Sequence, residues 1–473
     1  MGEGARRLLA RLFLGRSRQP GCETVIHLLQ IGKREITKMN PNPLRIKFLL
    51  PTMFLAAVAV SCSGQSDTPN SGANSDVSVK APSDEPVTIS ILNWNGMTDA
   101  EFDRYYVKPV AKKHPNITLT LIKKNAGTPQ DAIASHLMAG NFPDLIFVSN
   151  KDINDFLLAK AVSGMDELVA STHFDLQRFD PGAIASLQRK KEDGGLTAIP
   201  WAQNVGSLLY SKDVFDKFGM TYPKELMTWD ETLELARKMT RKEGDVQYVG
   251  MNLSSLSQFA QSLSVSYLSP SNKAIVDTPE WKRILEFYRT AFAIPGGATK
   301  ATLFGTKTVA MQPDWLSVTT NNAAKDPNFP WDVAGMPNFP ELLGKGREID
   351  THSLAISASS KHKEQAFQVI QTVTSDEVQT EMSQYGRVPV LADSKILSDF
   401  GSQVPYLANK NWAALFKVKP AKVRDTITPY DSIVLGLINP LADRLRAGET
   451  DINTMLRETQ EKADVALTAA LGN

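Results

Sequence analysis

Strand and helix signals alternate along the chain from Val87 onward, and this alternation limits the possible folds more than any other feature. The first signals are strands at 87–92, 117–122 and 143–148, and helices at 102–114 and 131–139. A βαβαβ order predicts a parallel sheet that is covered by helices. Ligands of such sheets bind at the carboxyl ends of the strands, here Trp94-Asn95 and Ser149-Asn150.

The mixed pattern continues to the end of the chain. Thr228-Trp-Asp-Glu231 has the form of a capping box that opens a helix, and Thr278-Pro279 begins another. The remaining signals are a strand at 354–356, a helix at 363–373 and a helical region at 432–467 in which Pro440 starts a new helix. No internal repeat is visible, and the order is too long for one sheet. The sequence therefore predicts an α/β protein with two lobes.

The N-terminal region has the features of a secretion signal. Phe48 to Val60 form an apolar run without charge that follows Arg45 and Lys47, and the run is too short for a permanent membrane span. It ends in Ala59-Val60-Ser61-Cys62, which resembles the lipobox of bacterial lipoproteins. We expect Cys62 to be lipidated and to become the mature N-terminus. The alternative is a simple signal peptide that is cleaved nearby.

The position of this signal is late in the chain. Met39 would give it an ordinary length, so we interpret 1–61 as a mis-extended start plus the signal peptide; the alternative is a genuine basic, amphipathic extension. Residues 62–86 are then the lipidated N-terminus and a tether rich in Ser, Pro, Asp, Asn and Gly. Such a composition favours disorder, and the coil would reach roughly 25–30 Å.

Charge and cysteine content exclude several classes of protein. With 52 basic and 51 acidic side chains the net charge is +1, which argues against nucleic-acid binding through a basic face. Without residues 1–61, 42 of the basic and 48 of the acidic side chains remain, a net charge of −6. Both cysteines, Cys22 and Cys62, precede the folded body, which excludes a disulfide scaffold and a thiolate metal site there.

No catalytic pattern is complete. H-E-x-x-H, G-x-S-x-G and P-loop motifs are absent, and His352 and His362 have no partner pattern. The S-x-x-K at Ser360 lacks its companion motifs, so we expect Ser360 to cap a helix. The acidic segment from Asp152 to Asp155 lacks the glycine and distal glutamate of a calcium loop. We predict no metal, no cofactor and no enzymatic activity.

Tryptophans beside turns are the strongest candidates for a binding site. Trp229 and Trp281 fall in the first turns of helices and are expected to pack in the core. Trp94, Trp201 and Trp315 are predicted at strand ends or loop edges beside Asn, Gln or Asp. This combination suits sugars, because C–H faces lie on the ring while hydroxyls bond to amides and carboxylates. The alternative for each is a buried tryptophan with a satisfied N–H group.

Several segments, in this order, resemble the extracellular solute-binding proteins of ABC importers, the sugar-binding group that includes maltose-binding protein. The resemblance covers roughly residues 87–470. It is carried by Thr197-Ala-Ile-Pro-Trp201 with Leu208-Leu-Tyr-Ser-Lys-Asp213, Phe218-Gly-Met with Pro223 and Thr228-Trp-Asp-Glu231, Gly305-Thr-Lys-Thr-Val-Ala-Met311 with Asp314-Trp315, Trp331-Asp-Val-Ala-Gly-Met-Pro337, and Gly386-Arg-Val-Pro389. Asp314 stands where small residues are usual in the family.

The resemblance implies a two-lobed periplasmic-binding-protein fold of type II, with a hinge between the lobes. Lobe one is placed at 87–200 and 350–402, and lobe two at 201–349 and 403–473. Carried over by position, the ligand-binding residues are Trp94, Asn95, Asp144, Gln203, Asn204, Trp315 and Arg387. Asp144 has equal claim to a structural role. Some relatives have a carboxylate at the position of Asn204, which leaves the sugar open.

The resemblance also implies a function. The chain is expected to be a monomeric lipoprotein, anchored outside the cytoplasm, that captures a sugar or oligosaccharide and delivers it to the permease subunits of an ABC importer. Alternatives in the same fold are a peptide, polyamine or acidic-sugar receptor, the last favoured by Arg387, and a sensor partner of a membrane kinase. An enzyme of carbohydrate breakdown would need two carboxylates about 5–10 Å apart in the cleft.

Overall fold

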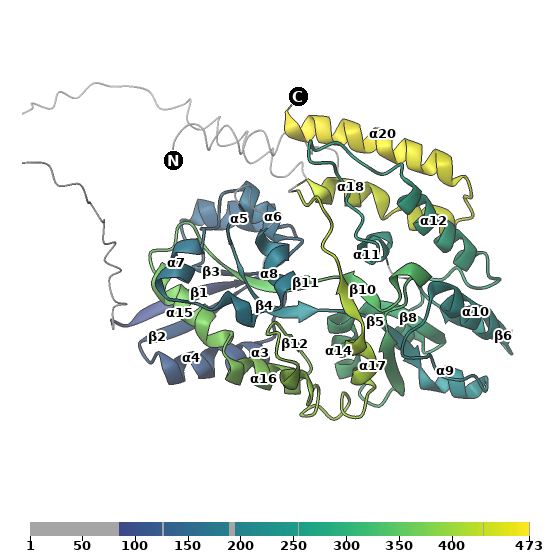
Figure 1. Ribbon diagram of the computed structural model, residues 1–473, viewed down its shortest axis with the longest axis horizontal. Helices are drawn as coiled ribbons and strands as arrows, with labels where there is room; N and C mark the ends of the chain where they lie inside the picture. The colour runs from purple at the N-terminus through teal and green to yellow at the C-terminus, as the bar shows by residue number, and fades with distance from the viewer. Residues whose placement is uncertain (1–84, 125–126, 189–193, 254, 429, 473) are drawn as a thin grey trace, which may run out of the picture. The chain divides into compact units, whose positions relative to one another are not determined.

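The computed structural model describes residues 85–472 except 125–126, 189–193, 254 and 429. The predicted signal, its start at Met39 and the lipidation site Cys62 lie outside the described residues. Within the described part, the chain forms two main sheets with helices around them (Figure 1). The α/β class and the two-lobed architecture predicted from the sequence are both confirmed.

The first lobe is built on a six-stranded sheet in the order β12-β4-β11-β3-β1-β2. Its strands are β1 (Val87–Asn93), β2 (Ile117–Lys123), β3 (Leu145–Ser149), β4 (Ile199–Asn204), β11 (Asp350–Ile356) and β12 (Val388–Pro389). β1 pairs in parallel with both β2 and β3, which confirms the predicted βαβαβ start. β11 is antiparallel to β3 and to β4, so segments far apart in the sequence complete this sheet.

Helices lie on both faces of this sheet in Figure 1. They are α3 (Asp99–Phe102), the π-helix η2 (Asp103–Val107), α4 (Lys108–Lys113), α5 (Pro129–Ala139), α6 (Ile153–Leu158), α7 (Asp166–Ser171), η3 (Leu176–Arg178), α8 (Pro181–Gln188), α15 (Lys363–Val373) and α16 (Asp376–Gln384). The strand β3 is apolar and buried at Leu145–Val148, as expected for a central strand that is covered on both sides. The core of this lobe therefore forms around β1 and β3.

The second lobe is built on a five-stranded sheet in the order β6-β7-β8-β5-β9. Its strands are β5 (Gly206–Ser211), β6 (Arg241–Glu243), β7 (Val246–Met251), β8 (Val309–Trp315) and β9 (Trp331–Gly335). Its helices are α9 (Lys212–Lys217), α10 (Trp229–Met239), α11 (Leu256–Gln261), α12 (Pro279–Phe292), α13 (Leu303–Thr306), α14 (Leu316–Lys325), α17 (Trp412–Lys417), α18 (Asp431–Ile438), α19 (Leu441–Arg446) and α20 (Ile452–Leu471). Trp229 and Trp281 are fully buried here, which confirms their predicted packing role.

Two one-residue connections leave the first sheet, one to the second sheet and one to a two-stranded sheet formed by β10 and β13. β4 passes to β5 through Val205 alone, and β10 (Lys345–Glu348) passes to β11 through Ile349 alone. β10 also pairs in parallel with β13 (Lys419–Ala421). The predicted bounds of the lobes stay predictions; β4 continues in the first sheet as far as Asn204. We call the region around Val205 and Ile349 the hinge.

Two of the predicted helix starts are found in the structure, and one prediction of a cap fails. Thr228 and Glu231 form the predicted capping box of α10, and Pro440 occupies the N-cap position of α19. The prediction that Ser360 caps a helix is wrong. His362 holds the N-cap position of α15, and the Ser360 hydroxyl instead donates to Asp144 Oδ1 at 2.8 Å. Three residues before a helix, Ser360 is too far from the first turn to satisfy its N–H groups.

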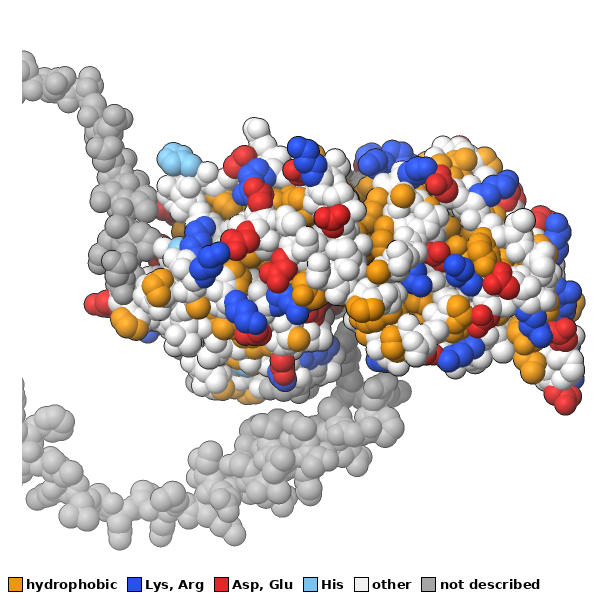
Figure 2. All heavy atoms as spheres, turned by 90° about the horizontal axis from the view of Figure 1, so that it is seen from below, with side chains coloured by type: hydrophobic (Ala, Val, Ile, Leu, Met, Phe, Trp, Pro, Cys, Tyr) orange, Lys and Arg blue, Asp and Glu red, His pale blue; other side chains and the backbone are white. Residues whose placement is uncertain are grey.

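The surface of the described residues carries charges of both signs. On the face shown in Figure 2, acidic and basic side chains are interspersed among apolar ones. This distribution agrees with the near balance of charges in the sequence. Among the described helices, none combines the length and the apolar character that crossing a membrane requires.

Candidate functional site

Trp94 follows β1 at the carboxyl end of the first sheet. Its indole nitrogen donates to Asp152 Oδ2 at 2.9 Å, and the edge of Phe156 packs against it. The Lys124 ammonium lies 3.9 Å from its ring centroid, within the range of a cation–π contact. Only 5% of Trp94 is exposed. The Trp94 ring is therefore largely covered, by Lys124 on one face and by Phe156 at an angle to it.

Asn95 lies directly after Trp94 and is half-buried. Its side-chain amide nitrogen is buried and has no hydrogen-bond partner among the described residues. An unsatisfied buried donor costs free energy, so such a group is a candidate for a ligand contact. Asn95 therefore has a property expected of a binding residue in a protein without its solute.

Asn204 ends β4 and connects three parts of the hinge. Its amide nitrogen donates to Asp350 Oδ2 at 3.3 Å, and its oxygen accepts from the Ser317 N–H group at 3.1 Å. Asp350 begins β11 in the first sheet, whereas Ser317 lies in the first turn of α14 in the second lobe. The amide, rather than a carboxylate, is required here because one end must donate and the other accept.

Trp315 ends β8 at the same hinge. It pairs in register with Gly206, the first residue of β5, and the Leu316 N–H group donates to the Val205 carbonyl at 2.9 Å. Trp315 is half-buried, and the Arg347 guanidinium lies 4.8 Å from its ring centroid. Among the predicted residues, the structure thus brings Trp315 and Asn204 together.

Asp314, beside Trp315, has fixed hydrogen bonds. Its Oδ1 accepts from the Trp315 N–H group at 2.7 Å, and its Oδ2 accepts from the Gln312 amide at 2.8 Å. Each carboxylate oxygen can accept a further hydrogen bond. The Asp314 carboxylate is therefore held in a fixed orientation at the end of β8, next in sequence to the residue that carries the half-buried ring.

Gln203 and Arg387 lie near each other at the edge of the first sheet, because Gln203 pairs with Val388 of β12. Arg387 donates to Glu101 Oε1 from Nε at 2.9 Å and from Nη2 at 2.6 Å. Its third nitrogen, Nη1, lies 3.3 Å from His352 Nδ1. The guanidinium is thus held inside the first lobe by partners from α3 and β11.

These contacts shift two pKa values. Burial alone would raise the pKa of Glu101, but the Arg387 charge and hydrogen bonds from Thr98 and Arg387 outweigh it and lower the pKa. Burial, with a smaller effect of Arg387, lowers the pKa of His352 to about 3. His352 is therefore neutral at neutral pH, and its Nδ1 accepts from Arg387.

Asp144 does not join the other predicted residues. It lies before β3, at the opposite end of that strand from Ser149, and Trp94 lies near the carboxyl ends. Its Oδ2 accepts from the Ser90 N–H group at 3.0 Å and from the Ser90 hydroxyl at 2.7 Å. Together with the Ser360 bond these contacts tie β1, β3 and the segment after β11. They give Asp144 the structural role that the sequence left open.

Trp201 is placed differently from the sequence interpretation. It lies within β4 rather than at a strand end, and it is fully buried against Tyr105, Tyr106 and Phe147. Its side chain points into the core because successive side chains of a strand face opposite sides. Trp201 is therefore a core residue and not a candidate for sugar binding.

Sequence reasoning missed several residues that hold the candidate site. They are Glu101, Asp152, Ser317, Arg347, Asp350 and His352. Only Glu101 had a usable signal, since Thr98-Asp-Ala-Glu101 is a capping box. Each of the other five contacts a partner that is at least 30 positions away in the sequence. Asp152 has a local partner as well, Ser149. Their partners depend on the tertiary fold.

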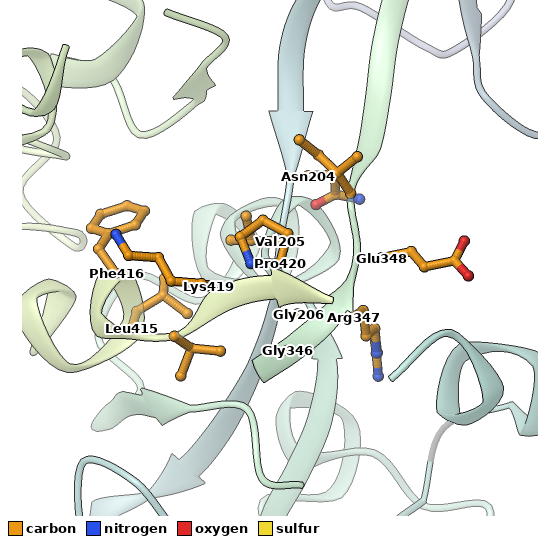
Figure 3. Close-up of a pocket in the computed structure, with 12 residues that line it drawn as sticks. Asn204, Val205, Gly206, Gly346, Arg347, Glu348, Leu415, Phe416, Lys419 and Pro420 are labelled. Carbon is orange, nitrogen blue, oxygen red and sulfur yellow. The ribbon is translucent and has the colours of Figure 1, made fainter. Parts of the chain in front are cut away.

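A small pocket, open to solvent and with a volume of about 30 Å³, lies at the hinge (Figure 3). Val205 and Ile349 both line it, together with residues from Leu415 to Pro420. Among the predicted binding residues, Asn204 lines this pocket. Arg347 and Glu348 point in different directions from β10 in Figure 3.

Residues 105–408 match the family described as bacterial extracellular solute-binding proteins. The chain belongs to this family. Members of the family are binding proteins, and the described residues hold no cluster of His, Cys, Asp or Glu that could bind a metal ion.

One relative and two solved structures show what the chain is similar to. A protein of Escherichia coli (strain K12), named as a periplasmic-binding protein of an ABC transporter, is 25% identical over 199 residues, which are 39% of this chain and 44% of that protein. The sugar-binding protein MalE of Xanthomonas citri has a TM-score of 0.63 at 20% identity, covering 82% of this chain and 98% of its own. UgpB of Mycobacterium tuberculosis, in complex with glycerophosphocholine, has a TM-score of 0.66 at 17% identity, covering 81% and 99%.

Proposed function

We propose that this solute-binding protein is the lipid-anchored receptor of an ABC importer, and that it captures a sugar or oligosaccharide for a membrane permease. The observation that carries the proposal is the group at the hinge: the half-buried Trp315 ring, the adjacent Asp314 carboxylate and the Asn204 amide. An aromatic face with hydrogen-bonding groups at its edge suits a hydroxylated ring. The sugar-binding MalE of Xanthomonas citri, with the same fold, is consistent with it.

The charges near these residues support a neutral solute. Arg387 would favour an acidic sugar if its guanidinium faced the solute alone, but it donates two hydrogen bonds to Glu101. Arg347 is buried, and the Asp314 carboxylate interacts favourably with its charge. A cation that is already compensated by a carboxylate adds little affinity for a second anion. The acidic-sugar alternative therefore loses its main support.

A second candidate is a small phosphodiester of glycerol. One observation favours it, namely the Lys124 ammonium over the Trp94 ring, which could turn toward a phosphate. The similarity in fold to UgpB, which was solved with glycerophosphocholine, gives this candidate a concrete probe.

Delivery to a permease requires the receptor to stay at the membrane surface. We propose that a lipid on Cys62 provides this, with residues 63–86 as a tether and the monomer as the working unit. Binding without chemistry fits this role, because a receptor must release its solute intact. Closure of the two lobes around the solute would be a population shift driven by contacts to both lobes.

A thermal-shift screen tests the proposal directly. The full chain is screened against mono- and oligosaccharides and against glycerophosphodiesters, with Trp315→Ala as the matched variant. A solute at about 100 times its Kd adds about 2.7 kcal/mol of stability, and the shift should shrink in the variant. A sugar that stabilises the protein and is recovered intact supports the receptor. Stabilisation by the phosphodiesters alone supports the second candidate, and cleavage of the sugar overturns both.

A further inference from the structure

Arg347 lies in β10, three residues before the first sheet resumes at Asp350, and it is 97% buried. The path of the Arg347 side chain is limited by the residues around it. It runs past the Cα of Gly206, where an added Cβ would lie 3.0 Å from Arg347 Cδ and 3.2 Å from Cγ. The guanidinium then reaches the Trp315 ring at 4.8 Å. Gly206 and Trp315 are partners in the register of β5 and β8, so Arg347 crosses both strands at their hinge ends.

The charge of Arg347 survives its burial. Burial lowers the pKa of Arg347 to about 10, opposed by the charges of Asp314 and Tyr288. The side chain is therefore protonated at neutral pH. A desolvated cation over an indole face is attracted more strongly than an exposed one. The same Asp314 also accepts from the backbone N–H group of Trp315, so the carboxylate that interacts with the Arg347 charge is held by the residue that carries the ring.

We propose that Arg347 is a positioning residue for solute binding: carried by the hinge strand β10, it covers one face of the Trp315 ring and fixes the opposite face as the surface on which the solute stacks. This inference rests on the proposed function of Trp315. Arg347 acts through the ring and does not itself contact the solute.

The strand β10, which carries Arg347, is anchored beside the hinge. β10 leads into β11 through Ile349 alone, and the Glu348 carboxylate accepts from the Arg424 guanidinium at 2.6 Å. Arg424 also bonds to Asp431 at 2.8 Å, and all three side chains are largely buried. The strand that carries Arg347 is thus anchored by a buried ion-pair group and can hold the ring in one orientation.

The test compares Arg347→Met with Arg347→Lys and uses Arg446→Met as the matched control. Arg446 also lies 4.8 Å from a ring centroid, that of Phe292, but on α19 away from the hinge. Arg347→Met should weaken binding of the sugar found in the screen about tenfold, Arg347→Lys should restore part of it, and Arg446→Met should leave the Kd unchanged. Apo melting temperatures are measured for every variant.

A double-mutant cycle separates positioning from direct contact. In a Trp315→Ala background, Arg347→Met should change the Kd less than twofold, because the ring through which it acts is gone. An undiminished tenfold loss in that background overturns the inference and assigns Arg347 a contact of its own. Equal affinity of Arg347→Met and the parent chain overturns it as well.

The indole N–H resonance of Trp315 provides a readout that needs no solute. The resonance is assigned with Trp315→Phe and recorded in the apo protein. Arg347→Met should shift and broaden it, whereas Arg446→Met should not. An unchanged resonance overturns the inference. If no sugar binds, the proposed function fails even where the resonance shifts; if sugar binds and the resonance is unchanged, only the inference about Arg347 fails.

Discussion

Replacing Trp315 by alanine separates a binding role from a structural one. Loss of a stacked aromatic ring should weaken solute binding by about 2–4 kcal/mol, the range of a binding hot spot. This exceeds the loss of one neutral hydrogen bond, about 1 kcal/mol, because the ring contributes both area and stacking. Neighbouring Asp314 would keep its bond from Gln312 and could still accept from a hydroxyl. Binding should therefore be weakened rather than abolished.

The structure also gives the expected change in apo stability. Trp315 is half-buried, so its removal forfeits only part of the burial that a core tryptophan provides. The Arg347 guanidinium loses its aromatic partner, a contact of about 1–2 kcal/mol for a desolvated cation. The backbone pairing of Trp315 with Gly206 remains. We therefore expect the free energy of unfolding to fall by more than the loss of the Arg347 contact alone, but by less than the loss of about 3–5 kcal/mol expected for a fully buried tryptophan.

Calorimetric titration and chemical unfolding on the same variant provide the assay. Trp281→Ala is the control, because Trp281 is fully buried and should lose about 3–5 kcal/mol of stability. The reasoning is refuted if Trp315→Ala loses as much stability as Trp281→Ala yet binds the solute normally once folded. That outcome would remove Trp315 from the site.

Three further outcomes are expected. Cys62→Ser should release the protein from the membrane fraction, which fractionation and mass spectrometry of the N-terminus check; a protein that stays bound contradicts the anchor. Residues 87–473 should contract on binding and leave the solute intact, measured by small-angle scattering and chromatography; an unchanged radius of gyration argues against closure. His352→Gln should make the free energy of unfolding less dependent on pH between 6.5 and 3. A pKa lowered from 6.5 to about 3 gives a stability contribution that is complete above pH 6.5 and falls as the pH drops, by up to about 1.4 kcal/mol per pH unit. Denaturant titrations at several pH values check this, and the same dependence on pH in the variant and the parent protein contradicts it.

The elements of the fold could be predicted because their signals are local. An alternating apolar pattern marks β1, a continuous apolar run marks β3, and the Thr228–Glu231 box marks the start of α10. Local signals do not give the neighbours of a strand. The antiparallel pairing of β11 with β3 joins His352 to Ser149, about 200 residues apart, and only the packed lobe decides it.

Part of the candidate site could be predicted, because residue type is also a local signal. The tryptophans could be selected by residue type, but the direction of each ring depends on where its strand ends. Trp201 lies three residues inside the end of β4 and faces the core, whereas Trp315 is the last residue of β8 and is half-buried. The sequence also suggested Arg387 for an acidic sugar without its partner Glu101, which lies 286 positions away.

The four residues of β10 have a consequence for how this chain tolerates insertions. Adjacent residues of opposite charge have different partners there: the Arg347 guanidinium lies against the Trp315 ring, and the Glu348 carboxylate pairs with Arg424. An extra residue inserted before Arg347 would advance the sequence by one place and set the Arg347 guanidinium against that of Arg424 in a buried space, where like charges repel strongly. The turn at Gly244, by contrast, has open space around it. A library of single-residue insertions should therefore show the deepest loss of folded protein at β10 and near-normal yields at Gly244.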